Sequence, residues 1–394
     1  MKDWKRLLAL PLSLALTVSL CACGVTGDPT GGTASPDPSP GLSDVPSQDP
    51  GAEPSIEVDL TRNAVDFSAG LSPEDVLLTV NGADIPADLF LYWLFWDCYY
   101  FEYSYYYYGI TVADFADMLL EDTVNSAIYY TVLRQRAAQL GCLPTDAQLQ
   151  EISDEMQADG PEYYDSLKTA YGLSDGSFDY LSTISCYYEN LLDALVPTAT
   201  DEMLNGYVYQ VRHILLKTVD GQNQPLSDDE IAAQKALAED ILAQLQAVEG
   251  EELQSLFDEL MNQYSEDGRD ENGDLRAPDG YTAVPGDMVS AFEEASLALP
   301  IGGLSGIVES SYGYHIILRG EVEDFTDYIE DCRAYQMDRE LDTLTEAAEV
   351  TRTDALDALD VAEVYERSIA YQNAVMAQYE APGSEPPVYG DAED

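Results

Sequence analysis

The chain has 394 residues, enough for two or more domains. Its formal net charge is −57 at pH 7, from 74 acidic and 17 basic side chains. Such a surface repels nucleic-acid phosphates, so nucleic-acid binding is excluded as a main role. A solvated acidic surface is the ordinary interpretation of this charge, and cation buffering is the alternative.

The N-terminus predicts export. Basic side chains within the first six residues precede an apolar run over 7–20, which is too short to span a bilayer as a mature helix. The sequence before Cys23 resembles a bacterial lipobox, with Leu20 three residues before the cysteine and Ala22 directly before it. This resemblance implies a lipoprotein signal peptide over 1–22 and a lipid on Cys23 that anchors the protein extracytoplasmically to the bacterial cell membrane. An ordinary signal peptide cut nearby is the alternative.

Composition marks two segments as unlikely to pack into a core. Residues 23–56 are rich in Gly, Pro, Ser and Asp and predict a flexible tether, and 381–394 predict a disordered acidic tail. The remaining cysteines have wide spacing without a zinc-ligand pattern, so we expect no metal site. Export permits disulfides, and both free thiols and disulfides stay open for Cys98, Cys142, Cys186 and Cys332.

The segment 76–205 predicts an N-terminal helical, chaperone-like domain. Folded structure is expected to begin near a short strand at 76–80, which leads into a turn at Asn81-Gly82. Helical spacing of apolar residues follows from Pro86. Because the next segments carry the same helical signal, we expect an all-α block before the central domain.

One helix of this block is unusually aromatic. Phe90, Trp93 and Leu94 fall on one stripe, which Asp97 interrupts, and they are interpreted as core. The run from Tyr105 to Tyr108 favours a client-binding surface instead, because four successive residues cannot all face inward on a helix.

The segment 206–322 predicts a different architecture. Its order of β, α, α, β, α, β, β favours a small α+β domain with helices packed on a four-stranded, mostly antiparallel sheet. Its first and last strands carry the only histidines of the chain, His213 and His315. If these strands are neighbours, both imidazoles point into one cleft; buried core histidines are the alternative. Helices over 323–380 follow, and we expect them to pack on the N-terminal domain.

The central domain resembles the parvulin family of peptidyl-prolyl isomerases, because six sequence blocks occur in the family's order and at similar spacing. The blocks are Arg212-His213-Ile214-Leu215-Leu216, Tyr264-Ser265-Glu266-Asp267, Gly273-Asp274-Leu275, Gly286-Asp287-Met288 continuing through Phe292-Glu293-Glu294-Ala295, Gly302-Gly303-Leu304-Ser305-Gly306-Ile307-Val308, and Gly313-Tyr314-His315-Ile316-Ile317. With the lipobox and the flanking helical blocks, the layout resembles extracytoplasmic foldase lipoproteins of the PrsA type, related in layout to SurA-type chaperones.

The resemblance implies catalysis without cofactor or metal, since prolyl isomerisation breaks no bond and meets only a rotational barrier of about 20 kcal/mol. An apolar pocket grips the proline ring, and a polar group lies near the twisting amide. The implied catalytic residues are His213, Asp267, His315 and Ser310. The implied substrate-binding residues are Leu275, Met288 and Phe292.

The sequence departs from the family pattern in two loops. Residues 276–281 replace the glycine and aromatic that many relatives place after Gly-Asp-Leu, and Tyr281 is expected to supply the aromatic wall. The loop after the first strand has Lys217 but no basic cluster, so phosphoserine-proline specificity is not expected.

The sequence therefore predicts a lipid-anchored peptidyl-prolyl cis-trans isomerase and foldase that acts on X-Pro segments of unfolded or partly folded exported polypeptides. The alternative is a non-catalytic holdase chaperone that uses the parvulin domain and the aromatic helices as client-binding surfaces.

Overall fold

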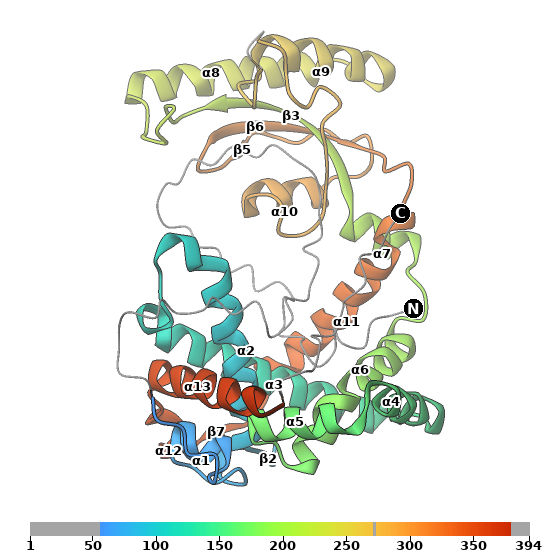
Figure 1. Cartoon of the computed structure of the whole chain (residues 1–394). Helices are drawn as coiled ribbons and strands as arrows, with labels where there is room; N and C mark the ends of the chain where they lie inside the picture. Colours follow the sequence, from blue (N-terminus) through green and yellow to red (C-terminus); the bar gives the residue numbers. More distant parts are fainter. Residues whose placement is uncertain (1–55, 271–272, 380–394) are drawn as a thin grey trace, which may run out of the picture. The chain divides into compact units, whose positions relative to one another are not determined.

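A computed structural model describes residues 56–270 and 273–379 (Figure 1). The chain divides into two compact units: the first combines the residues up to Leu195 with those from Arg339 onward, and the second is Val196–Asp338. The predicted signal peptide, Cys23, the tether up to residue 55 and the acidic tail lie outside the described residues. Within the described ranges, no helix combines the length and apolar character needed to cross a membrane.

The first unit is mostly helical. Its helices are α1 (Ala64–Ala69), α2 (Ala87–Tyr105), α3 (Ala116–Leu140), α4 (Asp146–Asp159), α5 (Pro161–Tyr171), α6 (Asp175–Leu195), α12 (Asp354–Asp357) and α13 (Val361–Tyr379), with the 3-10 turns η3 (Tyr106–Tyr108) and η4 (Val112–Phe115). Ordered structure begins earlier than expected, because Asn63 caps α1 by accepting a hydrogen bond from the Val65 amide. The four cysteines that the sequence left open are free thiols.

A small sheet accompanies these helices, so the flanking segments are not purely α as expected. It has the antiparallel order β2-β1-β7, from β1 (Val76–Val80), β2 (Ala83–Pro86) and β7 (Val350–Arg352). The predicted turn joins β1 to β2, with positive φ angles of 50° at Asn81 and 79° at Gly82. The other two strands have only four and three residues, too few for an alternating pattern to identify them.

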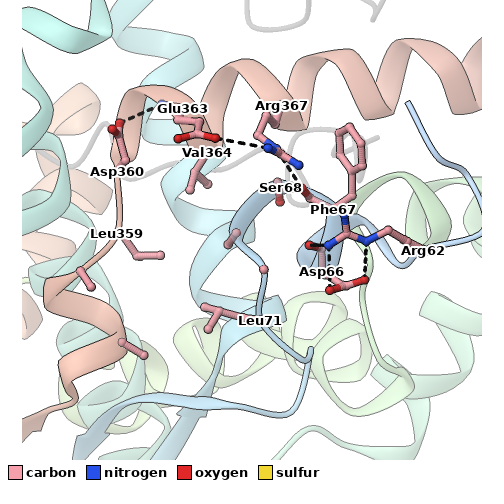
Figure 2. Close-up of a pocket in the computed structure, with 14 residues that line it drawn as sticks. Arg62, Asp66, Phe67, Ser68, Leu71, Leu359, Asp360, Glu363, Val364 and Arg367 are labelled. Carbon is pink, nitrogen blue, oxygen red and sulfur yellow. Dashed lines mark hydrogen bonds and ion pairs between the residues drawn. The ribbon is translucent and has the colours of Figure 1, made fainter. Parts of the chain in front are cut away.

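The C-terminal helix α13 packs on α1, α2, α3 and α5 within this unit. The Arg367 guanidinium donates to the Phe67 carbonyl at 2.9 Å, and the Tyr371 hydroxyl donates to the Arg62 carbonyl at 2.6 Å. Figure 2 shows the neighbouring pocket of about 410 Å³, where Arg62 pairs with Asp66 and Arg367 pairs with Glu363. The first unit is therefore completed by residues from the end of the chain.

Helix α2 carries the predicted core stripe, and the run from Tyr105 to Tyr108 spans its last residue and η3. Phe90, Trp93 and Leu94 are buried, which confirms their interpretation as core. Asp97, which interrupts their stripe, accepts a hydrogen bond from the Thr123 hydroxyl at 2.6 Å, and burial raises the pKa of Asp97 to about 6.

The second unit contains the predicted α+β domain. Its elements are α7 (Asp201–Tyr207), β3 (Tyr209–Lys217), α8 (Asp228–Leu245), α9 (Gly250–Tyr264), β4 (Tyr281–Ala283), α10 (Ser290–Ala298), β5 (Val308–Glu309), β6 (Gly313–Gly320) and the turn η5 (Thr326–Tyr328). From β3 onward the order of elements is the predicted one. The four strands form an antiparallel sheet in the order β4-β3-β6-β5, which confirms the predicted four-stranded sheet. Helix α11 (Ile329–Glu346) begins in this unit and ends in the other.

Helices cover both faces of this sheet (Figure 1). On one face, Ile214 and Ile316 pack with α8 and α9; on the other, Val211 and Ile317 pack with Phe292 of α10. Because side chains alternate along a strand, His213 and His315 share the α10 face.

Candidate active site

The two histidines meet across the central strands. Strands β3 and β6 pair so that His213 lies opposite Ile317 and His315 lies opposite Leu215, which makes the histidines diagonal neighbours. Their Nδ1 atoms are 3.1 Å apart and their rings are stacked with centroids 5.3 Å apart. Both side chains are buried, so their polar atoms need partners within the protein.

A chain of hydrogen bonds supplies those partners. His213 Nε2 is 3.1 Å from Asp267 Oδ2, and His315 Nε2 is 2.7 Å from Ser310 Oγ. The Asp267 carboxylate only accepts, so His213 donates from Nε2 and, when neutral, accepts at Nδ1. His315 then donates from Nδ1 and accepts at Nε2 from the Ser310 hydroxyl. Every bond in the chain therefore points toward Asp267.

The charges of the site agree with this direction. Burial tends to raise the pKa of Asp267, but the hydrogen bond and charge of His213, with the Tyr281 hydroxyl, hold it at about 2. Burial, together with the charge of His213, lowers the pKa of His315 to about 4. At neutral pH the chain thus runs from a neutral imidazole to an ionised carboxylate.

Tyr281 contacts the same carboxylate. Its hydroxyl donates to Asp267 Oδ2 at 2.5 Å, and its ring meets the His213 ring edge-on at 5.8 Å between centroids. Burial and the Asp267 charge raise the pKa of Tyr281, so the hydroxyl keeps its proton. Gly280 allows this approach, because it has a φ of +85° and a Cβ there would lie 2.1 Å from the Val211 carbonyl oxygen.

The apolar candidates lie on two sides of this polar chain. The Phe292 ring lies 4.9 Å from the His213 ring and 5.2 Å from the His315 ring, and half-buried Met288 packs in the same cluster. Leu275 packs instead against the core on the α8 and α9 side. The structure therefore places Phe292 and Met288 in one cluster, whereas Leu275 lines the pocket beside Asp267.

A small pocket opens beside Asp267. It is lined by His213, Met261, Ser265, Asp267, Leu275, Ala277, Gly280 and Tyr281, and its volume of about 10 Å³ holds one water molecule but not a proline ring.

Sequence reasoning passed over Ser265 as a site residue. Its side chain is buried, and its Oγ accepts from the Leu215 amide at 3.1 Å and from the Asp267 amide at 3.4 Å. These bonds tie the Asp267 loop to the histidine strand. The available signal was its place two residues before Asp267 in the Tyr-Ser-Glu-Asp block.

The described residues include no group of three or more His, Cys, Asp or Glu side chains placed to hold a metal ion. What they offer is a preorganised floor with an aromatic ring on one side and a partly buried carboxylate at one end.

Comparison with known proteins identifies the class of this domain. Residues 198–322 match the family model of the PPIC-type PPIase domain. This segment is therefore a parvulin-type peptidyl-prolyl isomerase domain.

The wider chain is similar to curated proteins over part of its length. It is 28% identical over 235 residues to the foldase protein PrsA of Halalkalibacterium halodurans, covering 56% of this chain and 65% of that protein. It is 38% identical over 117 residues to the chaperone SurA of Chromohalobacter salexigens, covering 29% and 22%. The chain thus spans less than two thirds of the length of either relative. The crystal structure of PrsA from Bacillus cereus is similar over 80% of this chain and 95% of that one, with 17% identity and a TM-score of 0.32.

Proposed function

We propose that residues 198–322 catalyse cis-trans isomerisation of X-Pro bonds and that the whole chain is a foldase for exported polypeptides. The observation that carries this proposal is the Phe292 ring packed against both imidazoles, whose hydrogen bonds end on an ionised Asp267. Rotation about the bond is favoured by a site that holds the ring and stabilises the twisted amide, and it needs no proton transfer. We assign His213, His315 and Ser310 to the floor of the site, and Phe292, Met288 and Tyr281 to the grip on substrate.

The proposed location is the outer face of the cell membrane, through a lipid on Cys23. The support for it is the apolar run over 7–20 and the Leu-Cys-Ala-Cys sequence that follows. The names of the relatives, a foldase and a chaperone, support unfolded polypeptides as clients.

The test measures isomerisation of a short proline peptide by the intact chain and by two matched variants. We expect Phe292→Leu to lower kcat/KM by about tenfold or more, because it removes the ring that faces the histidines. Phe257→Leu alters a fully buried phenylalanine on the opposite face of the same sheet, so its kcat/KM should stay within about twofold of the original.

The proposal would be wrong if the intact chain did not accelerate isomerisation of the proline peptide. It would also be wrong if Phe292→Leu and Phe257→Leu lowered kcat/KM equally. The small volume of the pocket beside Asp267, about 10 Å³, favours the second candidate, a non-catalytic holdase. A chain that suppresses aggregation of an unfolded protein without accelerating isomerisation would establish that alternative.

A further inference from the structure

The end of α2 exposes aromatic side chains that the isomerase site does not use. Of the 15 exposed large hydrophobic side chains in the described ranges, five lie within one 13-residue stretch of the chain, and this cluster is called the tyrosine surface. It consists of Tyr103, Tyr106, Tyr107, Tyr108 and Phe115, exposed by 60%, 54%, 92%, 73% and 37%. Rings this exposed contribute little to the core, and an exposed aromatic cluster marks an interaction site.

Ring contacts link parts of this surface. Tyr106 and Tyr107 contact each other at 5.4 Å between ring centroids. A series of contacts joins Phe115 to Tyr108: Phe115 of η4 lies 5.2 Å from Phe101 between ring centroids, Phe101 lies 4.9 Å from Tyr105, and Tyr105 lies 6.3 Å from Tyr108. A partner can therefore touch several rings at once, and tyrosine offers this contact area at low entropic cost because its side chain has few rotamers.

The charged side chains close to these rings in the sequence are all acidic. The sequence has no lysine or arginine between Arg62 and Arg134, whereas Glu102, Asp114 and Asp117 are exposed among the aromatic residues. Hydrogen bonds from the Thr111 hydroxyl and amide lower the pKa of Asp114, so this carboxylate stays ionised.

The arginines that the C-terminal segment brings into this unit are already paired. Arg352 pairs with Glu121 and Asp357, and Arg367 pairs with Glu363. None of these three ion pairs uses the carboxylates of Glu102, Asp114 or Asp117, so those charges remain available to a partner.

We propose that the tyrosine surface binds extended polypeptide segments that carry lysine or arginine. Cations are attracted both to the carboxylates and to the faces of the tyrosine rings. The chain's own segments 24–55 and 380–394 contain acidic side chains and no basic ones, so the surface repels them. The choice of a polypeptide partner rests on the proposed foldase function; the surface itself is separate from the isomerase site.

The test uses the full chain and two labelled peptides of equal length without proline, one with four arginines and one with four glutamates. Fluorescence anisotropy should show the arginine peptide binding about tenfold or more tightly than the glutamate peptide, with an affinity that falls as salt is added. The combined variant Tyr106→Ser, Tyr107→Ser and Tyr108→Ser should lose about tenfold in affinity for the arginine peptide. Tyr163→Ser, at an exposed tyrosine of α5, should change that affinity less than about twofold.

A second variant tests the charge without touching the rings. Glu102→Gln with Asp117→Asn should reduce the preference for arginine over glutamate by about threefold or more, and a glutamine oxygen can still accept the hydrogen bond from Tyr365. Equal binding of the two peptides overturns the proposal, and so does undiminished binding by the triple tyrosine variant.

The isomerase assay separates this inference from the proposed function. The tyrosine variants should retain full activity on a short proline peptide, and Phe292→Leu should retain binding of the arginine peptide. An intact chain that prefers the arginine peptide but does not accelerate isomerisation counts against the proposed function alone. An intact chain that accelerates isomerisation but binds the two peptides equally counts against the tyrosine surface alone.

Discussion

At the scale of single residues, the protonation of His315 controls the hydrogen-bond chain. Its Nε2 accepts from Ser310, and a proton on that nitrogen would turn the acceptor into a donor. The pKa of His315 is about 4, below the ordinary value of 6.5, because the ring is buried. The proton therefore binds only under acid conditions, and neutral pH keeps the chain intact.

We expect kcat/KM to stay constant from about pH 8 to pH 6 and to fall as the pH drops through about 4, where His315 takes up its proton. The measurement is a pH profile of kcat/KM with a proline peptide that has no ionisable side chain. A pH profile of kcat/KM without a fall near pH 4 would contradict this role of His315.

The lowered pKa of His315 also affects stability. Between pH 6.5 and 4 only the unfolded chain binds this proton, so the free energy of unfolding falls as pH falls.

The sequence predicted single residues unevenly. Alternation along two strands placed His213 and His315 on one face, because side-chain direction in a strand has a period of two. It could not predict the hydroxyl bond from Tyr281 to Asp267, since that bond depends on how closely the loop at Gly280 approaches β3. Leu275 was expected beside Met288 and Phe292 through the resemblance, and its place on the other core depends on the path of the rebuilt loop.

At the scale of elements, helix α10 is held to the sheet by a buried arginine. Arg319 of β6 lies on the same face as His315, and its Nη1 donates to the carbonyls of Ser296 at 2.9 Å and Leu297 at 3.0 Å. Its Nη2 donates to the Asn205 carbonyl at 2.5 Å. These carbonyls lie at the end of α10 and in α7, so one side chain fixes the helix that carries Phe292.

We expect Arg319→Met to destabilise the second unit by about 2–4 kcal/mol, because buried carbonyls lose their donors. Far-UV circular dichroism during urea unfolding measures the change. Arg212→Met is the matched control on the neighbouring strand. Its partner Asp258 is half exposed, so the loss there should be about 1 kcal/mol or less. Equal losses in the two variants would contradict the anchoring role of Arg319.

Elements with strong local signals were predictable and short ones were not. The capping boxes at Thr145 with Gln148 and at Ser227 with Glu230 both start helices in the structure. Strand β7 has only three residues and pairs with a strand at the other end of the chain, so no local pattern could reveal it.

At the scale of the whole molecule, each unit can be observed separately. The three tryptophans of the sequence are Trp4, Trp93 and Trp96, and Val196–Asp338 contains none. Trp93 and Trp96 lie in α2, so tryptophan fluorescence reports on the first unit.

We expect removal of residues 339–394 to abolish the cooperative unfolding transition seen by tryptophan fluorescence, because β1 loses β7 and the core loses α13. The second unit should keep its own transition in circular dichroism. Removal of 380–394 alone is the control and should leave the fluorescence transition in place. A truncated chain that kept this transition would show that the N-terminal residues fold without the C-terminal ones.

The pairing of Val80 with Val350 also sets an order of folding events. A growing chain presents β1 and the apolar faces of α2 and α3 long before β7 and α13 exist, whereas the residues of the second unit emerge as one uninterrupted block. Contacts between such distant residues close slowly, because the loop between them must first be ordered. The isomerase unit is therefore expected to fold before the helical unit, whose apolar side chains stay uncovered until β7 and α13 have been synthesised.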